Sequence, residues 1–242
     1  MAENQKNRNV TPPAIYLHRL GCPKIEADHD LLQAGFRARG ARMVETLEHA
    51  DTVVISTCAF IEDARKEAID DILEAVRWKK QDHGRRIFVT GCMPLRYEDE
   101  LRDEIPEVDG WYGFGKWKNA LETIVPGEDI NLNDPGITHP GQMNPGLENR
   151  LSRSRTDHPE PFAYVRIAEG CDRRCAYCAI PSMRGPYHSR PEQSILLEIE
   201  HLLESGVREI ILVAQEINSY GYDLGTKRGI ESLLYKAGEL VS

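Results

Sequence analysis

Three short apolar segments in the N-terminal part of the chain each end at a cysteine. They are AIYLHRLGC, ending at Cys22, DTVVISTC, ending at Cys58, and RIFVTGC, ending at Cys92. Continuous apolar runs such as Val53–Ile55 and Ile87–Val89 are typical of strands that are buried on both faces of a parallel sheet. The pattern therefore predicts three buried parallel strands.

The segments between these strands have helical spacing. ADHDLLQAGFRARG has the helical spacing of Leu31, Leu32, Gly35 and Phe36, and Gly40 is suited to end the helix. EDARKEAIDDILEAVRWKK carries one apolar stripe, formed by Ala68, Ile69, Ile72, Leu73 and Val76. Strands that alternate with helices predict right-handed crossovers and an α/β fold with a parallel sheet.

The three cysteines stand about one strand–helix repeat apart. In a parallel sheet the carboxyl ends of the strands share one edge, where such folds bind their ligands. Three buried, inert thiols are the alternative, because free cysteine is among the most buried residue types. Three cysteines at equivalent strand ends, each beside Gly or Thr, favour a shared site.

The composition changes between Pro126 and Pro161, where Pro, Gly, Asn and Asp dominate and no periodicity is present. This segment is typical of a linker. After it, FAYVRIAEGC and REIILVAQ predict two strands, the second ending near Gln215. SRPEQSILLEIEHLLESG predicts a helix with Ser189 and Glu192 as a capping box, and GIESLLYKAGELVS predicts another helix. The predicted organisation is a disordered tail at 1–13, an α/β domain at 14–125, a linker at 126–161 and a second α/β unit at 162–242.

Charge and cysteine content narrow the function classes. The formal net charge is −9, from 30 basic and 39 acidic residues, which argues against a protein that wraps nucleic acid and fits a basic protein partner or a small substrate better. The chain has no apolar run of membrane-spanning length, and MAENQKNRNVTPP lacks the features of a signal peptide. We therefore expect no membrane association and a cytoplasmic location. Thiols stay reduced there, so six cysteines indicate metal binding or catalysis rather than disulfides.

The stretch GCDRRCAYC concentrates the other three cysteines, Cys171, Cys175 and Cys178. Soft thiolates select zinc, copper(I) or iron–sulfur clusters. Structural zinc needs four ligands, usually from closely spaced pairs, and the first gap is too wide for that pattern, although His188 could complete a site. Three thiolates on a four-iron cluster would leave one iron open for a substrate or cofactor. A non-catalytic metal-binding or interaction module remains the alternative.

GCDRRCAYC resembles the signature of the radical S-adenosylmethionine (SAM) superfamily, with Tyr177 at its aromatic position. The wider chain resembles the methylthiotransferase family, over most of 14–124 and 162–225. The matching motifs are LGCPK, STCAFIEDARKEAI, VTGC, EIPEVDG and IAEGCDRRCAYCAIPSMRGPYHSRP. The resemblance implies an N-terminal methylthiotransferase domain followed by the start of a radical SAM (β/α) partial barrel. Because only two strands of that barrel are evident, the chain is interpreted as a truncated N-terminal portion that turns over poorly alone.

The same resemblance implies cofactors and a reaction. One 4Fe-4S cluster is expected on Cys171, Cys175 and Cys178, and a second on Cys22, Cys58 and Cys92. SAM would bind the open iron of the first cluster, with Tyr177 and Gln215 as candidate neighbours, and no catalytic side chain is assigned. The closest branch uses an electron-donor protein and adds a methylthio group to an aspartate of small-subunit ribosomal protein S-twelve. The tRNA-modifying branch is the alternative.

Two further groups of residues have ambiguous patterns. Five arginines flank the second cysteine cluster: Arg166, Arg173, Arg174, Arg184 and Arg190. We interpret them as solvated charges paired with Glu169 and Asp172, in preference to a phosphate-binding or acid-binding surface. The aromatic segment GWYGFGKW is interpreted as packing on the sheet edge, in preference to stacking on bases.

Overall fold

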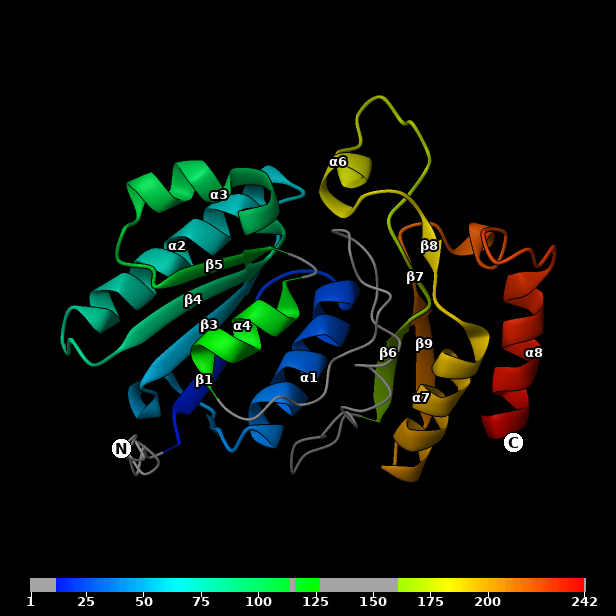
Figure 1. Cartoon of the computed structure of the whole chain (residues 1–242), viewed down its shortest axis with the longest axis horizontal. Helices are drawn as coiled ribbons and strands as arrows, with labels where there is room; N and C mark the ends of the chain where they lie inside the picture. Colours follow the sequence, from blue (N-terminus) through cyan, green and yellow to red (C-terminus); the bar gives the residue numbers. More distant parts are fainter. Residues whose placement is uncertain (1–11, 114–115, 127–160, 242) are drawn as a thin grey trace, which may run out of the picture.

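The computed structural model describes residues 12–113, 116–126 and 161–241, which form two α/β units (Figure 1). The elements of the N-terminal unit are β1 (Ala14–Arg19), α1 (Pro23–Ala38), β2 (Arg42–Val44), the 3-10 helix η1 (Leu47–His49), β3 (Thr52–Thr57), α2 (Glu62–Lys79), β4 (Arg86–Gly91), α3 (Cys92–Glu104), β5 (Gly110–Gly113) and α4 (Trp117–Ile124). Those of the C-terminal unit are β6 (Phe162–Arg166), β7 (Ala168–Glu169), α6 (Ile180–Arg184), β8 (His188–Ser189), α7 (Glu192–Glu204), β9 (Glu209–Val213), the 3-10 helix η2 (Ile217–Ser219) and α8 (Gly229–Val241).

The N-terminal sheet is parallel throughout and has the strand order β2-β1-β3-β4-β5. This confirms the predicted fold class. The order reverses between β1 and β3, as it does in flavodoxin-like sheets. Ligands of such sheets bind outside the carboxyl ends of the strands at that reversal, so the topology directs attention to the ends of β1 and β3.

Helices cover both faces of this sheet, α2 and α3 on one face and α1 and α4 on the other (Figure 1). Successive residues of the central strands point to opposite faces. Val53 and Ile55 pack in the cluster that includes Ile72 of α2, whereas Val54 packs with Phe36 of α1. Burial on both faces explains why these strands are continuously apolar.

Helices α1 and α2 match the predictions, and Gly40 follows α1 with φ +84°. The prediction for Leu73 is wrong, because its side chain is 39% exposed. The buried stripe of α2 instead continues through Ala75 and Val76. The short strand β2 was not predicted.

The aromatic segment packs at the sheet edge, as expected. Its first residues form β5, which lies at the end of the sheet order and pairs with β4. Trp111 is 3% exposed and belongs to the α2 face of the core. Phe114 lies outside the described residues.

The C-terminal unit is a strand–helix–strand unit. Strands β6 and β9 are parallel, and α7 connects them and packs beneath them with Ile195 and Ile199. The predicted capping box is wrong, because Pro191 is the N-cap residue of α7 and no side chain caps it. Ser189 lies in β8, where its hydroxyl accepts a hydrogen bond from Gly221 N (2.8 Å), and Glu192 bonds Ser232 of α8.

The predicted tail at 1–13 and linker at 126–161 fall almost wholly outside the described residues, so both stay predictions. Within the described ranges, none of the helices combines the length and the apolar character that crossing a membrane requires. The two units meet where α1 packs against β6, which places one helix between the two sheets (Figure 1).

Candidate functional site

The first cysteine triad lies at the carboxyl edge of the N-terminal sheet. Cys22 follows β1, Cys58 follows β3, and Cys92 begins α3 directly after β4. All three side chains contact one hydrophobic cluster. Burial raises the pKa of the Cys92 thiol, and the proximity of Cys58 and Cys22 raises it further, while Arg184 lowers it. The sheet topology thus brings together three thiols that are far apart in sequence.

Glycines control how the chain leaves two of these strands. Gly21 has φ +121°, and a Cβ on it would lie 3.1 Å from Cys58 Cβ. Gly91 has φ +98°, and a Cβ on it would lie 2.4 Å from the carbonyl oxygen of Thr57. A side chain at Gly91 would displace the end of β3, and one at Gly21 would crowd Cys58 and the Ile25 side chain. Both glycines therefore favour the close approach of the triad.

The second cysteine triad lies on the irregular loop between β7 and α6. Cys171 is 8% exposed, Cys175 is exposed and Cys178 is half-buried. Cys178 N donates to the Cys175 carbonyl oxygen (3.1 Å), which closes a tight turn between these two residues. Tyr177 projects into solvent with 89% of its surface exposed. The loop therefore presents two accessible thiols beside one that is anchored.

No set of three or more His, Cys, Asp or Glu side chains in the described ranges is close enough to hold a single metal ion. Ligands of an iron–sulfur cluster bind different irons, so they stand further apart than ligands of one ion. Each triad supplies three soft thiols, and those of the first triad also contact an apolar cluster. Three thiols fit an iron–sulfur cluster with one open iron better than a structural zinc ion, which needs four ligands. The His188 side chain, considered above as a fourth zinc ligand, lies in β8.

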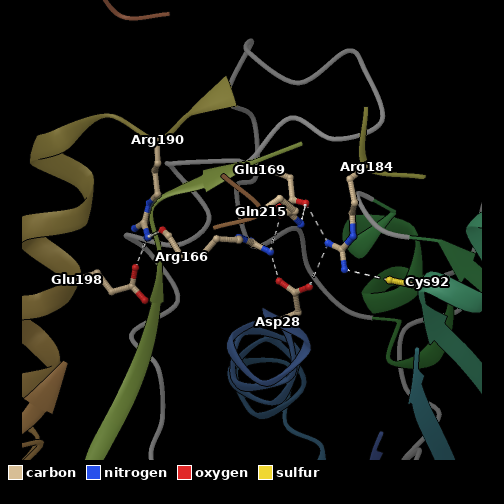
Figure 2. Close-up of polar contacts among 8 residues, drawn as sticks. All are labelled: Asp28, Cys92, Arg166, Glu169, Arg184, Arg190, Glu198 and Gln215. Atoms are coloured by element: carbon tan, nitrogen blue, oxygen red, sulfur yellow. Dashed lines mark hydrogen bonds and ion pairs between the residues drawn. The ribbon is translucent and has the colours of Figure 1, made fainter. Parts of the chain in front are cut away.

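A buried network of charged side chains joins Cys92 of the first triad to Glu169, which lies two residues before Cys171 of the second (Figure 2). Arg184 Nη1 donates to Glu169 Oε1 (3.2 Å) and lies 3.9 Å from Asp28 Oδ2. Arg184 Nη2 donates to Cys92 Sγ (3.2 Å). Arg166 pairs with Asp28 and lies 3.7 Å from Glu169 Oε2. The carboxylates of α1 and β7 therefore hold two arginines at the junction of the units.

The interpretation of the flanking arginines as solvated is wrong for three of the five. Arg166, Arg184 and Arg190 are each at most 3% exposed. Arg190 forms a buried ion pair with Glu198 of α7 (Figure 2). Arg173 is exposed, as expected, although it pairs with Glu216 and not with the expected acids.

Each buried charge of the network is balanced by its neighbours. Burial alone lowers the pKa of Arg184, but Glu169, Cys92 and Asp28 raise it above its ordinary value overall. The guanidinium thus stays protonated while it is enclosed beside the Cys92 sulfur. No sequence pattern indicated that Asp28 and Glu198 would be buried, since both belong to helices, where charged residues normally face solvent.

A cavity of about 470 Å³ lies between the two units on the side of α1. Pro23 and Lys24, which follow Cys22, line one wall, and the segment from Leu212 to Asn218 lines the other. Gln215 Nε2 donates to Glu169 Oε1 (2.8 Å), while its Oε1 atom is buried and has no hydrogen-bond partner among the described residues. Gln215 thus lines the cavity, while its carboxamide oxygen is enclosed by the protein.

Comparisons with known proteins agree with this arrangement. Residues 14–113 match the uncharacterized protein family UPF0004, and residues 165–237 match the radical SAM superfamily. The chain is 42% identical over 221 residues to the ribosomal protein uS12 methylthiotransferase RimO of Thermotoga maritima, an alignment that covers 91% of this chain and 49% of that protein. It is 38% identical to the protein of the same name in Chlorobaculum parvum, with 96% of this chain and 49% of the relative covered.

The chain is similar, over nearly all of its length, to proteins named as ribosomal protein methylthiotransferases. It spans about half the length of these curated relatives.

Solved structures show the same fold at low sequence identity. The radical SAM methyltransferase TsrM from Kitasatospora setae, solved with cobalamin and a 4Fe-4S cluster bound, matches with a TM-score of 0.57 and 14% identity, covering 93% of this chain and 52% of that one. The cobalamin-dependent radical SAM enzyme OxsB matches with a TM-score of 0.52 and 12% identity, and the match covers 95% of this chain and 37% of the OxsB chain. Both matches extend over both units of this chain, so the fold of the two units together recurs in these structures.

Proposed function

We propose that this chain carries the cluster-binding part of a RimO-like enzyme that adds a methylthio group to an aspartate of ribosomal protein uS12. The observation that carries the proposal is the strand-end triad Cys22, Cys58 and Cys92, in a chain 42% identical to a protein named RimO. The domain limits 14–125, 126–161 and 162–242 are part of the same proposal. A reducing, cytoplasmic setting follows from the need for six free thiols.

Two 4Fe-4S clusters are proposed, one on each triad, with SAM beside the loop cluster. When bound, these groups would supply the electron and the radical chemistry that an unactivated C–H bond requires. The three loop thiols, Cys171, Cys175 and Cys178, would hold the cluster whose free corner takes SAM. An electron-donor protein is a further requirement of this proposal.

The chain's own residues would position the reactants. Cys171 is enclosed at the base of the loop and fixes the loop's geometry, whereas Cys175 and Cys178 are accessible from outside. Of the two candidate SAM neighbours, Gln215 is the better supported, because it lines the cavity between the units. The Tyr177 ring is exposed, so its role as a SAM neighbour requires that a bound partner covers it.

Metal analysis after anaerobic reconstitution tests the cofactor assignment. The unaltered chain should bind about eight irons, and the triple variants Cys22→Ala/Cys58→Ala/Cys92→Ala and Cys171→Ala/Cys175→Ala/Cys178→Ala about four each. Stoichiometric zinc in place of iron would instead support a structural metal-binding module. Equal iron content in all three proteins would refute the assignment of ligands.

Paired substrates test the reaction. The relatives are about twice as long as this chain, so the assay uses a protein that contains it together with the remaining half of those relatives. Supplied with SAM and a reductant, this protein should increase the mass of uS12 by one methylthio group and leave tRNA unchanged. Methylthiolation of tRNA alone would overturn the choice in favour of the tRNA-modifying, MiaB-like branch.

A further inference from the structure

Arg184 stands between the two cysteine triads and contacts elements of both units. Its side chain is 2% exposed. One arm of the guanidinium donates to Glu169 Oε1, two residues before Cys171, and the other donates to the sulfur of Cys92 (Figure 2). Both distances are 3.2 Å. A residue of the radical SAM unit therefore bonds directly to a thiol of the N-terminal triad.

The backbone next to Arg184 is fixed against the second triad. Cys171 N donates to the carbonyl oxygen of Gly185 (3.2 Å). Gly170 has φ +73°, and a Cβ on it would lie 2.0 Å from the carbonyl oxygen of Pro186. The segment that follows Arg184 is thus pressed against the start of the cysteine loop. Any displacement of this loop would move the guanidinium relative to Cys92.

The shape of arginine matters for this contact. A guanidinium is planar and presents several donors in a fixed fork, so it can satisfy a carboxylate and a sulfur at the same time. A lysine ammonium could keep the charge between Asp28 and Glu169, but it has no second arm at a fixed angle to reach Cys92. The two roles of Arg184, balancing buried carboxylates and donating to sulfur, are therefore separable by substitution.

We propose that Arg184 is a positioning residue that couples the two triads and makes the iron–sulfur cluster ligated by Cys92 easier to reduce. The inference rests on the proposed function, because it takes Cys92 as a cluster ligand. Hydrogen bonds to ligating sulfurs and nearby positive charge stabilise the more negative, reduced form of a cluster. Arg184 supplies both from within the protein interior, where solvent screens them little.

The test isolates the N-terminal cluster. In the background Cys171→Ala/Cys175→Ala/Cys178→Ala, only the first triad can hold iron, so one cluster contributes to the electron paramagnetic resonance spectrum and to the redox titration. Arg184→Met and Arg184→Lys should both lower the ratio of reduced to oxidised cluster at a given potential, by about tenfold for methionine, equivalent to about 59 mV for one electron. The lysine variant should also change the spectrum while the protein stays folded.

Arg166→Lys is the matched control, because Arg166 is equally buried and contacts the same two carboxylates. Its cluster should titrate as in the parent. If Arg184→Met fails to fold because Glu169 and Asp28 lose their partner, Arg184→Lys decides the matter. A folded Arg184→Lys variant with the parent's potential and spectrum overturns the inference and leaves the proposed function intact. A parent that assembles no cluster on Cys22, Cys58 and Cys92 refutes the proposed function, and the inference with it.

Discussion

A methyl group added at Gly91 should separate the two central strands at the edge where the first triad lies. Gly91 pairs with Thr57 of β3, and its φ and ψ are +98° and −144°. A Cβ at this position would lie 2.4 Å from the Thr57 carbonyl oxygen and 2.9 Å from its nitrogen. These atoms are backbone, so no rotation of a side chain can relieve the contact. Gly91→Ala must therefore displace the strand end.

Two costs add in this variant. A residue with a side chain in this backbone region costs about 1–3 kcal/mol. Forcing an extra carbon into packed surroundings costs about 1–3 kcal/mol more. Gly40→Ala is the matched control, because Gly40 also has positive φ (+84°) but nothing lies within 4 Å of an added Cβ. It should lose only about 1–2 kcal/mol, from backbone conformation alone.

Urea unfolding of the metal-free chain, followed by tryptophan fluorescence, measures the difference. Trp78 and Trp111 are buried in the N-terminal unit and report on its unfolding. With a slope of about 2 kcal/mol per molar urea, Gly91→Ala should unfold at a midpoint about 1 M below that of Gly40→Ala. Reconstituted Gly91→Ala should also lose iron from the first triad. Equal midpoints for the two variants would show that the close approach of β3 and Gly91 is not needed.

Three other substitutions probe buried polar groups. Glu198→Ala should destabilise the C-terminal unit by about 3–5 kcal/mol, because it leaves Arg190 buried without the Glu198 carboxylate, whereas the double variant Arg190→Met/Glu198→Leu should cost far less. Urea unfolding followed by circular dichroism measures both stabilities. A double variant as unstable as the single one would contradict this account. Burial lowers the pKa of His29 from 6.5 to about 4. Between pH 6.5 and pH 4 the unfolded chain therefore binds a proton at His29 more readily than the folded chain does. The free energy of unfolding should fall by about 3 kcal/mol as the pH drops through this range. A His29→Gln variant should lack this part of the pH dependence, and an unchanged slope in unfolding curves measured across that range would exclude His29 as its source. Tyr220→Phe removes the hydroxyl that donates to the Arg190 carbonyl oxygen (2.9 Å) and should cost about 1 kcal/mol by thermal unfolding, with Tyr222→Phe, on an exposed ring, as the silent control.

The N-terminal fold could be predicted because its determinants are local. Each central strand is a short apolar run, each helix between strands has a 3.6-residue period, and parallel order then fixes where Cys22, Cys58 and Cys92 lie. The strand β2 was missed because it has only three residues, one exposed and two half-buried, which is too short for a periodic pattern. The error at Ser189 has another cause. Its sequence matches a capping box, but the hydroxyl is used by the distant Gly221 in the folded chain.

The polar junction between the units could not be predicted, because no local pattern encodes it. Arg166 and Arg184 look like surface charges in the sequence, and in the fold they are buried beside Glu169 and Asp28, of which Asp28 lies more than a hundred positions earlier, in α1. The bond from Arg184 to Cys92 joins positions 92 residues apart. Contacts of this kind depend on how two units pack, which composition and periodicity do not specify.

The same junction explains why charged groups are tolerated in the interior here. Taking two arginines and two carboxylates out of water is unfavourable unless each is paired, and well-packed apolar side chains would stabilise the interface at least as well. Apolar contacts do not impose the directional geometry that hydrogen bonds and ion pairs require. Arg184 can donate to Cys92 only if α6, β7 and α1 hold their relative positions. Substituting Arg166, Arg184, Glu169 and Asp28 together with apolar residues should therefore leave a folded chain, because no buried charge is left without a partner, while a cluster on the first triad loses its dependence on the second unit. That outcome would separate the stability of the interface from its role in positioning the two sites.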